Sequence, residues 1–458
     1  MTTIANTHIQ PVLAAIEAAG GRPLIVGGTV RDWLLGREPE EYDVEVYGLP
    51  IDRLVELLSG FGRVDAVGRS FGVLKLRLPG GRELDVALPR RESKVGAGHR
   101  GFLAEPDPAM TPREAAARRD FTWNALALTP EGELLDFFGG REDLRAGIIR
   151  HTSAAFVEDP LRVLRAMQFA ARLDMRLAPE TAALCRALLP EAPALAIERV
   201  WGEWQKWALK GRRPSAGLRV LRETGWVALC PELGALVGCP QDATWHPEGD
   251  VWTHTSLVCD AAAAVAERDG LAGDDRLALV FAGLCHDLGK PATTTFEADG
   301  RIRSRGHDAA GVAPTEALLR RIGCPRRVVE RAARLVREHM AHLAARPTPR
   351  AVRRLAVRLE PATIVEWDRL IEADYAGRPP LPPKTPGRPF VDLARQLGAA
   401  DGKPAAILQG RHLVEAGMAP GPRLGQILQR AYQAQIDGKF ATLDQALAWV
   451  ARHARGGL

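Results

Sequence analysis

The sequence predicts an α+β protein: a small mixed sheet with helices over the first 150 residues, followed by an all-α remainder. Three observations lead to this prediction. Strand, turn and helix signals are interleaved as far as residue 150, strand signals nearly vanish from about residue 153, and helical periodicity continues from there to the end. The length of 458 residues is compatible with about three domains of ordinary size.

The composition favours a folded, cytoplasmic protein. Hydrophobic residues make up 46% and charged residues 26%, which suits a packed core rather than a disordered chain. No apolar run approaches the roughly 18 residues of a membrane span, and the chain does not open with a basic segment followed by an apolar one. The six cysteines form no CxxC pair, so we expect reduced thiols rather than a disulfide framework or a zinc ribbon.

The charge balance leaves two interpretations open. The formal net charge is +5, from 61 basic and 56 acidic residues, and only eight of the cations are lysine. The excess of arginine either reflects genome composition, since Ala, Gly and Pro are also abundant, or serves phosphate recognition by bidentate guanidinium groups. A nucleic-acid partner is therefore permitted but not required.

The first 150 residues alternate between strand and helix signals. An apolar strand ends in Gly27-Gly28 and runs directly into a helix, which indicates a tight turn. Pro79-Gly80-Gly81 between two alternating segments is typical of a hairpin. In chain order, we expect a strand at 24–26, a helix at 30–35, a strand at 42–47, a helix at 51–58 and a hairpin of strands at 73–78 and 83–88.

Two breaker-rich segments divide the helical remainder. A loop rich in Cys, Pro, Asp and Trp lies near 238–250, and the proline cluster at 378–383 precedes the last helices. We therefore expect four parts: a mixed head over 1–150, a helical neck over 151–240, a helical domain over 241–378 and a helical tail over 379–458.

Acidic residues occur at every second position along the predicted strand at 42–47, beginning with the residue just before it. Glu41, Asp43 and Glu45 therefore point the same way. Such a row is costly unless water solvates it or a cation neutralises it, and oxygen ligands suit Mg²⁺. The row is either an exposed edge strand or, with Asp85 from the strand at 83–88, a two-metal phosphoryl-transfer site behind the Gly27-Gly28 turn.

Four sequence blocks occur in a specific order. They are LIVGGTVRDWLLG from residue 24, EYD from residue 41, RRDFTWNALAL over 118–128 and EDPLRVLRAMQFAARL over 158–173. Over roughly residues 22 to 210 the chain resembles the class II tRNA nucleotidyltransferase and bacterial poly(A) polymerase family. The resemblance implies a nucleotidyltransferase-type sheet in a palm-like catalytic head.

The resemblance also implies roles for individual residues. The catalytic and Mg²⁺-binding carboxylates are Glu41 and Asp43, with Asp85 as the third acid; the family usually has aspartate at the first position, so Glu45 is an alternative to Glu41. The residues implied to bind the nucleotide are Gly27, Gly28, Arg31 and Asp32 for the triphosphate and metal, Arg119 for phosphates, Asp120 for the ribose 2′-hydroxyl and Asn124 for the nucleotide.

Asp159 and Arg162 are three residues apart at the start of a predicted helix, so both side chains can project from one face. An acid before proline at a helix start is also common for capping alone. By resemblance, this pair selects the base: a carboxylate accepts from the amino group of cytosine or adenine, and a guanidinium donates to the adjacent ring nitrogen. Uracil and guanine would be mismatched. Glu158 and Arg165 would support the pair.

A loop with three glycines lies over 94–102 and carries Lys94, His99 and Arg100. In the resembling enzymes a mobile loop at this place helps to switch from C to A addition. Its presence favours complete CCA addition.

Six of the eleven histidines fall between 246 and 342. Imidazole and carboxylate groups together suit a divalent transition metal. The segment LCHDLGKP resembles the HD-superfamily phosphohydrolases, which implies an HD-type helical domain. The implied metal ligands are His254, His286, Asp287 and Asp374, with His307 and His339 assigned to a second ion or to the phosphate and Lys290 facing the same cleft. The alternative is a degenerate domain that serves only as a tRNA platform.

Together these features predict a CCA-adding enzyme that uses CTP and ATP, grips the acceptor–T arm of tRNA with its neck and tail, and carries a metal-dependent hydrolase for RNA-end phosphates or 2′,3′-cyclic phosphates. Three alternatives remain: a poly(A) polymerase, a partial CC- or A-adding enzyme, or chiefly an HD-domain RNA-end phosphohydrolase. The sequence leaves the metal of the HD domain and the oligomeric state open.

Overall fold

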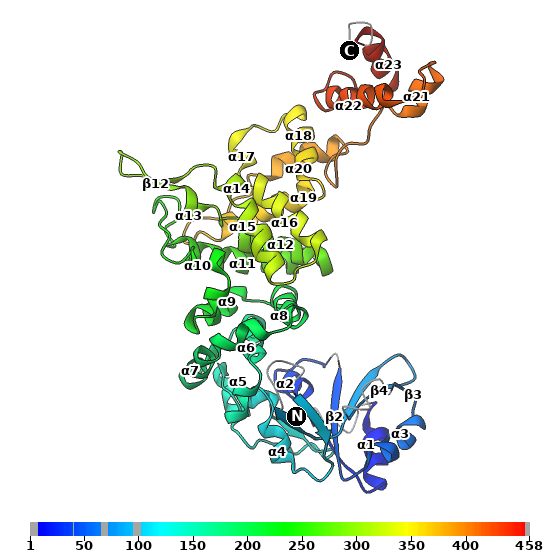
Figure 1. The fold of residues 1–458 in the computed structure, drawn as a ribbon, viewed down its shortest axis with the longest axis vertical. Coiled ribbons are helices and arrows are strands. Elements are labelled where there is room, and N and C mark those ends of the chain that lie inside the picture. Colours follow the sequence, from blue (N-terminus) through cyan, green and yellow to red (C-terminus); the bar gives the residue numbers. More distant parts are fainter. Residues whose placement is uncertain (1–7, 40, 66–71, 95–101, 454–458) are drawn as a thin grey trace. The chain divides into compact units, whose positions relative to one another are not determined.

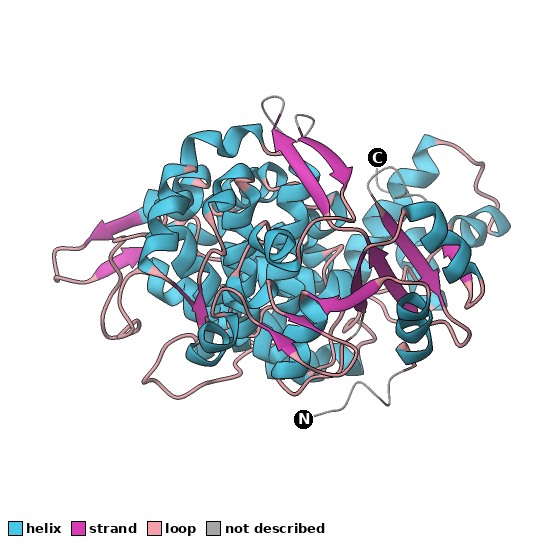
Figure 2. Ribbon diagram, turned by 90° about the horizontal axis from the view of Figure 1, so that it is seen from below, coloured by secondary structure: helices cyan, strands magenta, loops and turns pink. Residues whose placement is uncertain are grey.

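The computed structural model describes residues 8–39, 41–65, 72–94 and 102–453 (Figure 1). The chain forms two compact units. Unit 1 comprises residues 1–203 and 216–226, and unit 2 comprises residues 204–215 and 227–458. Helices make up most of the described chain (Figure 2). Nearly all strands belong to unit 1, and unit 2 is almost entirely helical, which confirms the predicted α+β class with a helical remainder. Within the described residues, no helix is long and apolar enough to cross a bilayer.

Unit 1 is built on a seven-stranded mixed sheet in the order β3-β4-β5-β2-β1-β8-β9. Strands β2 and β5 are parallel neighbours, whereas the other neighbours are antiparallel. The strands are β1 (Arg22–Val26), β2 (Tyr42–Tyr47), β3 (Arg63–Asp65), β4 (Val73–Arg77), β5 (Glu83–Ala87), β8 (Ala127–Leu128) and β9 (Leu134–Leu135).

Strand β2 shows why the sheet has one polar and one apolar face. Tyr42, Val44 and Val46 are buried, while Asp43 and Glu45 on the opposite face are only half-buried. Helices α1 (Gln10–Ala18) and α3 (Ile51–Ser59) pack against each other, and each buries its own apolar stripe. A one-residue slip of β2 would exchange its two faces, so the hydrophobic pattern fixes where the carboxylates lie.

The remaining elements of unit 1 lie outside this sheet. A separate hairpin, β6 (Arg90–Lys94) with β7 (Phe102–Pro106), flanks the predicted glycine loop; residues 95–101, with His99 and Arg100, lie outside the described residues. The other elements are α2 (Gly28–Leu34), α4 (Pro112–Ala117), η4 (Thr122–Asn124), α5 (Gly140–Ala146), β10 (Ile148–Ile149), η5 (Ala154–Glu158), α6 (Leu161–Leu173), β11 (Arg176–Leu177), α7 (Pro179–Ala187), η6 (Leu189–Ala194) and α9 (Pro214–Glu223). Helix α8 (Ile197–Lys210) continues from unit 1 into unit 2.

Unit 2 has a core of packed helices, α11 (Val251–Arg268), α12 (Gly273–Cys285), α16 (Arg326–Glu338) and α19 (Ile364–Ala376). One short hairpin, β12 (Thr294–Phe296) with β13 (Ile302–Ser304), interrupts the predicted helical run. Its other helices are η7 (Trp226–Leu229), α10 (Pro231–Gly234), α13 (Lys290–Thr293), α14 (His307–Ala310), α15 (Val312–Arg321), α17 (Ala341–Ala344), α18 (Pro349–Leu359), α20 (Arg388–Gln396), α21 (Gly410–Glu415), α22 (Pro422–Ile436) and α23 (Leu443–His453). The last three helices share their own hydrophobic cluster around Ile427, Ala431 and Phe440.

Candidate functional site

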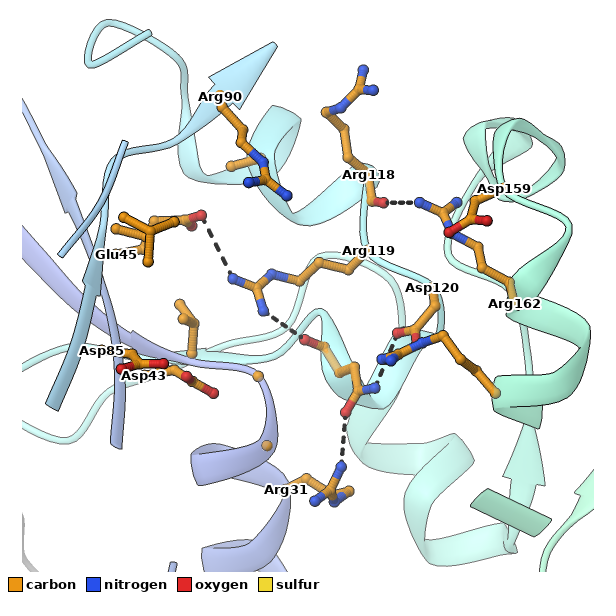
Figure 3. A pocket seen from close by; sticks show the side chains of 18 of the residues that line it. Arg31, Asp43, Glu45, Asp85, Arg90, Arg118, Arg119, Asp120, Asp159 and Arg162 are labelled. Atoms are coloured by element: carbon orange, nitrogen blue, oxygen red, sulfur yellow. Dashed lines mark hydrogen bonds and ion pairs between the residues drawn. The ribbon is translucent and has the colours of Figure 1, made fainter. Parts of the chain in front are cut away.

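A cavity of about 990 Å³ opens on the polar face of the sheet in unit 1 (Figure 3). The turn between β1 and α2, strands β2 and β5, the segment after α4 and the start of α6 all contribute to its wall. Acidic and basic side chains dominate that wall. The lining residues for which the sequence predicted a role are Arg31, Asp43, Glu45, Asp85, Arg119, Asp120, Asn124, Glu158, Asp159, Arg162 and Arg165, together with Gly27 and Gly28.

Two carboxylates lie side by side at the floor of this cavity. Asp43 on β2 is paired in register with Asp85 on the parallel strand β5. Thr29 ties the glycine turn to β2, because its Oγ1 accepts from the Asp43 backbone N–H at 3.0 Å and donates to the Glu41 carbonyl at 3.1 Å. The Lys75 ammonium lies 3.1 Å from Asp85 Oδ1. The sheet thus joins two acids that are 42 positions apart in the sequence.

The electrostatics of the pair favour a bound cation. Burial raises the pKa of Asp43, and the neighbouring Asp85 and Glu41 charges raise it further, while Arg119 opposes them. Hard oxygen ligands at such a point suit Mg²⁺. Glu41 comes just before β2 and is exposed, outside the cavity lining. Glu45 does line the cavity, but it accepts from Tyr47 Oη at 2.6 Å and lies 3.6 Å from Arg119 Nη2.

Gly27 permits a close approach that no other residue would. Its φ is +66° and ψ is −128°, and a Cβ at this position would lie 2.8 Å from Arg119 Nη1 and 3.5 Å from Asp43 Oδ2. Arg119 in turn donates to the Asn124 carbonyl at 3.5 Å. The glycine therefore lets the Arg119 guanidinium lie directly against the turn, with the Asp43 carboxylate close by.

Arg31 is a buried member of the wall. Its Nε and Nη2 donate to the two Asp32 carboxylate oxygens at 2.9 and 3.0 Å, and Nη1 donates to Asn124 Oδ1 at 3.1 Å. The guanidinium also stacks over Phe169 at 5.3 Å and Trp123 at 5.8 Å. Arg31 therefore holds Asn124 and Asp32 in fixed positions.

Asp120 is buried and fully engaged. It accepts from its neighbour's N–H, that of Phe121, at 2.8 Å, from Asn124 Nδ2 at 3.0 Å and from Arg165 Nε at 2.7 Å. Burial opposes ionisation, but Arg165 and these hydrogen bonds outweigh it and keep the pKa of Asp120 below its usual value. The carboxylate is therefore a charged, rigid acceptor at the cavity wall.

The predicted selector residues also lie on the wall, at the start of α6. Asp159 Oδ1 accepts from the Leu161 N–H at 3.1 Å, although Pro160 rather than Asp159 is the N-cap of the helix, and Oδ2 lies 2.7 Å from Arg199 Nη2. Arg162 donates to the carbonyls of Ala155 and Arg118 at 2.6 and 2.7 Å. Glu158 pairs with the Arg118 side chain at 3.0 Å. Helix, cap and arginine contacts thus fix both side chains.

A second cluster, in unit 2, consists of four buried imidazoles that converge through their Nε2 atoms. The Nε2 atoms of His254 and His286 are 3.2 Å apart, and those of His307 and His339 are 3.1 Å apart. Three of the rings direct Nδ1 at a backbone carbonyl: His286 at Gly283 (2.8 Å), His307 at Ser304 (2.6 Å) and His339 at Val336 (2.6 Å). Such bonds place the proton on Nδ1 and leave the Nε2 lone pairs facing one another.

Two buried carboxylates complete this centre. Asp374 Oδ1 lies 3.1 Å from His254 Nε2, and Asp287 lies 3.1 Å from His286 Nε2 and 3.4 Å from His307 Nε2. The Lys290 ammonium lies 2.7 Å from Asp287 Oδ2. The ligand atoms of His254, His286 and Asp374 lie within 4.8 Å of one another, as do those of Asp287, His307 and His339. Neutral imidazoles with facing lone pairs and adjacent carboxylates fit divalent transition metals.

Comparison with known proteins identifies two domains and one family. The chain matches the poly A polymerase head domain over residues 24–150 and the HD domain over residues 251–371. It is 39% identical over 424 residues to the "Multifunctional CCA protein" of Xanthomonas oryzae pv. oryzae, covering 90% of this chain and 97% of that protein.

The chain belongs to the multifunctional CCA protein family.

Two solved structures have the same fold as this member of the multifunctional CCA protein family. The CCA-adding enzyme of Bacillus stearothermophilus, in complex with CTP, has a TM-score of 0.67 and 22% identity over 99% of this chain and 98% of its own. The CCA-adding enzyme of Thermotoga maritima, complexed with tRNA, has a TM-score of 0.60 and 19% identity over 98% and 95%. These likenesses support the overall architecture.

Two residues beside the second cluster, in unit 2, were not identified from the sequence. His246 and Glu248 join His254 in a further group whose ligand atoms lie within 4.8 Å of one another. Both come from the irregular loop before α11, where no periodicity aligns side chains. Their spacing, eight and six residues before His254, was the only available signal.

Proposed function

We propose that this chain completes the 3′ end of tRNA by adding cytidine and adenosine nucleotides from CTP and ATP, with release of pyrophosphate. The observation that supports this most is the Asp43–Asp85 pair at the floor of an arginine-rich cavity, with a carboxylate and a guanidinium on the wall at Asp159 and Arg162. Membership of the multifunctional CCA protein family supports the same activity.

Asp43 and Asp85 would hold Mg²⁺, and their donor set fits this ion because both carboxylates offer only oxygen ligands. Burial raises the pKa of Asp43, so a bound cation would stabilise its ionised form. When bound, Mg²⁺ supplies activation of the attacking hydroxyl and charge neutralisation on the leaving pyrophosphate. The tRNA 3′-hydroxyl oxygen would form a bond to the α-phosphorus and lose its proton to water, while the bond from the α-phosphorus to the bridging oxygen breaks and pyrophosphate leaves.

The other wall residues bind and orient the substrates. Arg90, Arg118 and Arg119 contribute three guanidinium groups to the cavity wall, where triphosphate oxygens can be held in a bidentate way. Asp120, fixed by Arg165, is a rigid acceptor for a ribose hydroxyl. Holding the nucleotide in this way lowers the entropic part of the barrier.

The nucleotide selector rests on hydrogen-bond complementarity. A base whose edge presents an amino group beside a ring nitrogen satisfies both Asp159 and Arg162, and cytosine and adenine have this pattern. Uracil and guanine would leave the half-buried Asp159 carboxylate and the buried Arg162 guanidinium mismatched, at a cost of roughly several kcal/mol. Because Arg199 and backbone carbonyls already fix these side chains, little ordering is needed on binding.

The test is incubation with a tRNA transcript that lacks its CCA end, with each nucleotide alone and in pairs. We expect CTP alone to give two additions, CTP with ATP to give three, and UTP or GTP to give almost none. A long adenosine tail would instead indicate a poly(A) polymerase, and arrest after CC or a requirement for a CC end would indicate a partial enzyme.

A second function is supported by the four converging imidazoles. We propose that the HD-type centre holds a divalent transition metal and hydrolyses phosphomonoesters or 2′,3′-cyclic phosphates at RNA ends, with Lys290 attracting the phosphate. The bound metal would supply an activated water. The test is release of phosphate from 2′,3′-cyclic AMP and from a 3′-phosphorylated oligonucleotide in the presence of Co²⁺, Ni²⁺ or Mn²⁺. A His286→Ala chain should lose hydrolysis and retain nucleotide addition.

A further inference from the structure

The buried carboxylate of Glu248 lies behind the proposed metal centre of unit 2, on the far side of the His254 ring. Its Oε1 lies 2.8 Å from His254 Nδ1 and 2.9 Å from His246 Nδ1. Only 1% of the Glu248 side chain is exposed, and none of the His254 side chain is. The carboxylate therefore meets the ring nitrogen that faces away from His286 and Asp374.

His254 differs in this respect from the other three converging histidines. The Nδ1 atoms of His286, His307 and His339 face neutral backbone carbonyls. His254 Nδ1 also has a carbonyl near it, that of Gly377 at 3.3 Å, but the carboxylate is closer. An anionic acceptor holds the proton on Nδ1 more strongly than a carbonyl does, and it increases the basicity of Nε2.

The loop before α11 fixes Glu248 in this position. Asp250 caps the helix by accepting from the Thr253 N–H at 2.9 Å, and its other oxygen accepts from the Gly238 N–H at 2.7 Å. Gly249, with φ +127°, supplies a turn that other residues rarely adopt. The second oxygen of Glu248 has no hydrogen-bond partner within the described part of the chain. Its charge is therefore directed at the two imidazoles rather than at a cation elsewhere.

We infer that Glu248 is a positioning residue of the metal centre: it orients the His254 ring, fixes its tautomer and strengthens Nε2 as a ligand for a divalent transition metal. This inference rests on the proposed HD-type function. His246 Nδ1 contacts the same Glu248 oxygen, Oε1, and its side chain is half-buried. We assign His246 a secondary role, because the contact between Glu248 and His254 does not depend on it.

The test is a titration of the metal-free full-length chain with Co²⁺, followed by the visible absorption of imidazole-bound cobalt. A Glu248→Gln chain keeps the shape and loses the charge, and should bind Co²⁺ about 10–100-fold more weakly. A His246→Gln chain should bind within about threefold of the parent. Glu232→Gln, which removes a carboxylate paired with Arg321 elsewhere in unit 2, is the matched control and should not change the affinity.

Thermal unfolding of the metal-free chains separates positioning from stability. If Glu248 acts through His254, Glu248→Gln should retain nucleotide addition and lose affinity for Co²⁺ by more than any change in metal-free stability explains. Equal Co²⁺ affinity in Glu248→Gln and parent chains would overturn the inference while leaving the metal centre intact. If the parent binds no more Co²⁺ than a His286→Ala chain, the proposal that this centre binds a metal is wrong, and the inference about Glu248 is wrong as well.

Discussion

Replacing Gly27 by alanine tests whether the glycine turn shapes the catalytic cavity. At φ +66° and ψ −128° an alanine is strained by roughly 1–3 kcal/mol. Its Cβ would lie 2.8 Å from Arg119 Nη1, whereas ordinary contacts begin at 3.4 Å. The guanidinium must therefore move by roughly 0.6 Å away from the turn, which disturbs its hydrogen bond to the Asn124 carbonyl. Displacements near 1 Å cost up to about 100-fold in rate, so we expect kcat/KM for CTP to fall by roughly 10–100-fold.

Gly36→Ala is the matched control for this experiment. Gly36 also has a positive φ, +72°, but a Cβ there would meet no atom within 4 Å. We expect it to lose about 1 kcal/mol of stability in urea unfolding and to add CTP to tRNA within about twofold of the parent rate. If Gly27→Ala kept the parent kcat/KM, or if both variants lost activity equally, the close approach of Arg119 to the turn would have no catalytic role.

Three further outcomes follow from the described side chains. Asp159→Ala should reduce the preference for CTP over UTP, measured as a ratio of kcat/KM values, because it removes the acceptor for the cytosine amino group; an unchanged ratio would remove Asp159 from the selector. Chelation with EDTA should abolish nucleotide addition and excess Mg²⁺ should restore it, whereas addition in metal-free buffer would contradict the role of Asp43 and Asp85. Burial raises the pKa of Asp368 to about 6, so the folded state holds a proton that the unfolded state releases near pH 4, and stability falls between these pH values. Asp368→Asn should therefore match the parent in urea unfolding at pH 4 and exceed it by roughly 3 kcal/mol at pH 7; equal stability at both pH values would contradict this shift.

Local patterns were sufficient to predict some of the elements around the transferase site, but not α4, η4, β8 and β9. The alternation from Tyr42 to Tyr47 gave β2 with its observed bounds, and Pro79-Gly80-Gly81 gave the β4–β5 hairpin. Both patterns are short-range, because the period of two and the turn residues report the local backbone directly. The two-residue strands β10 and β11 were not predicted, since two residues are too few to show a period.

Non-local relations needed the structure. The parallel pairing of β2 with β5 is what brings Asp43 beside Asp85, and no turn between these strands encodes it. The choice between Glu41 and Glu45 was open for the same reason: spacing puts both on one face, but only Glu45 reaches the cavity lining, where Tyr47 and Arg119 engage it. The roles assigned to individual site residues remain predictions.

In the HD-type centre, too, a local motif could be predicted from the sequence and a non-local contact could not. The His286-Asp287 pair and its neighbours identified the domain, because this short motif has a distinctive sequence. Glu248 escaped notice because it lies in an irregular loop and contacts His254 through the nitrogen opposite the ligand atom. Residues that act through another side chain leave little trace in sequence spacing.

The central claim is that Asp43 and Asp85 gather Mg²⁺ for transfer of a nucleotide to a tRNA end. Its most direct test is single-turnover addition of CTP to a tRNA transcript lacking CCA, comparing the parent with Asp43→Asn, which keeps the side-chain shape and removes the charge. We predict a loss of at least about 1000-fold in the rate of the chemical step, with CTP binding retained. An Asp43→Asn chain that added cytidine at the parent rate would contradict the claim.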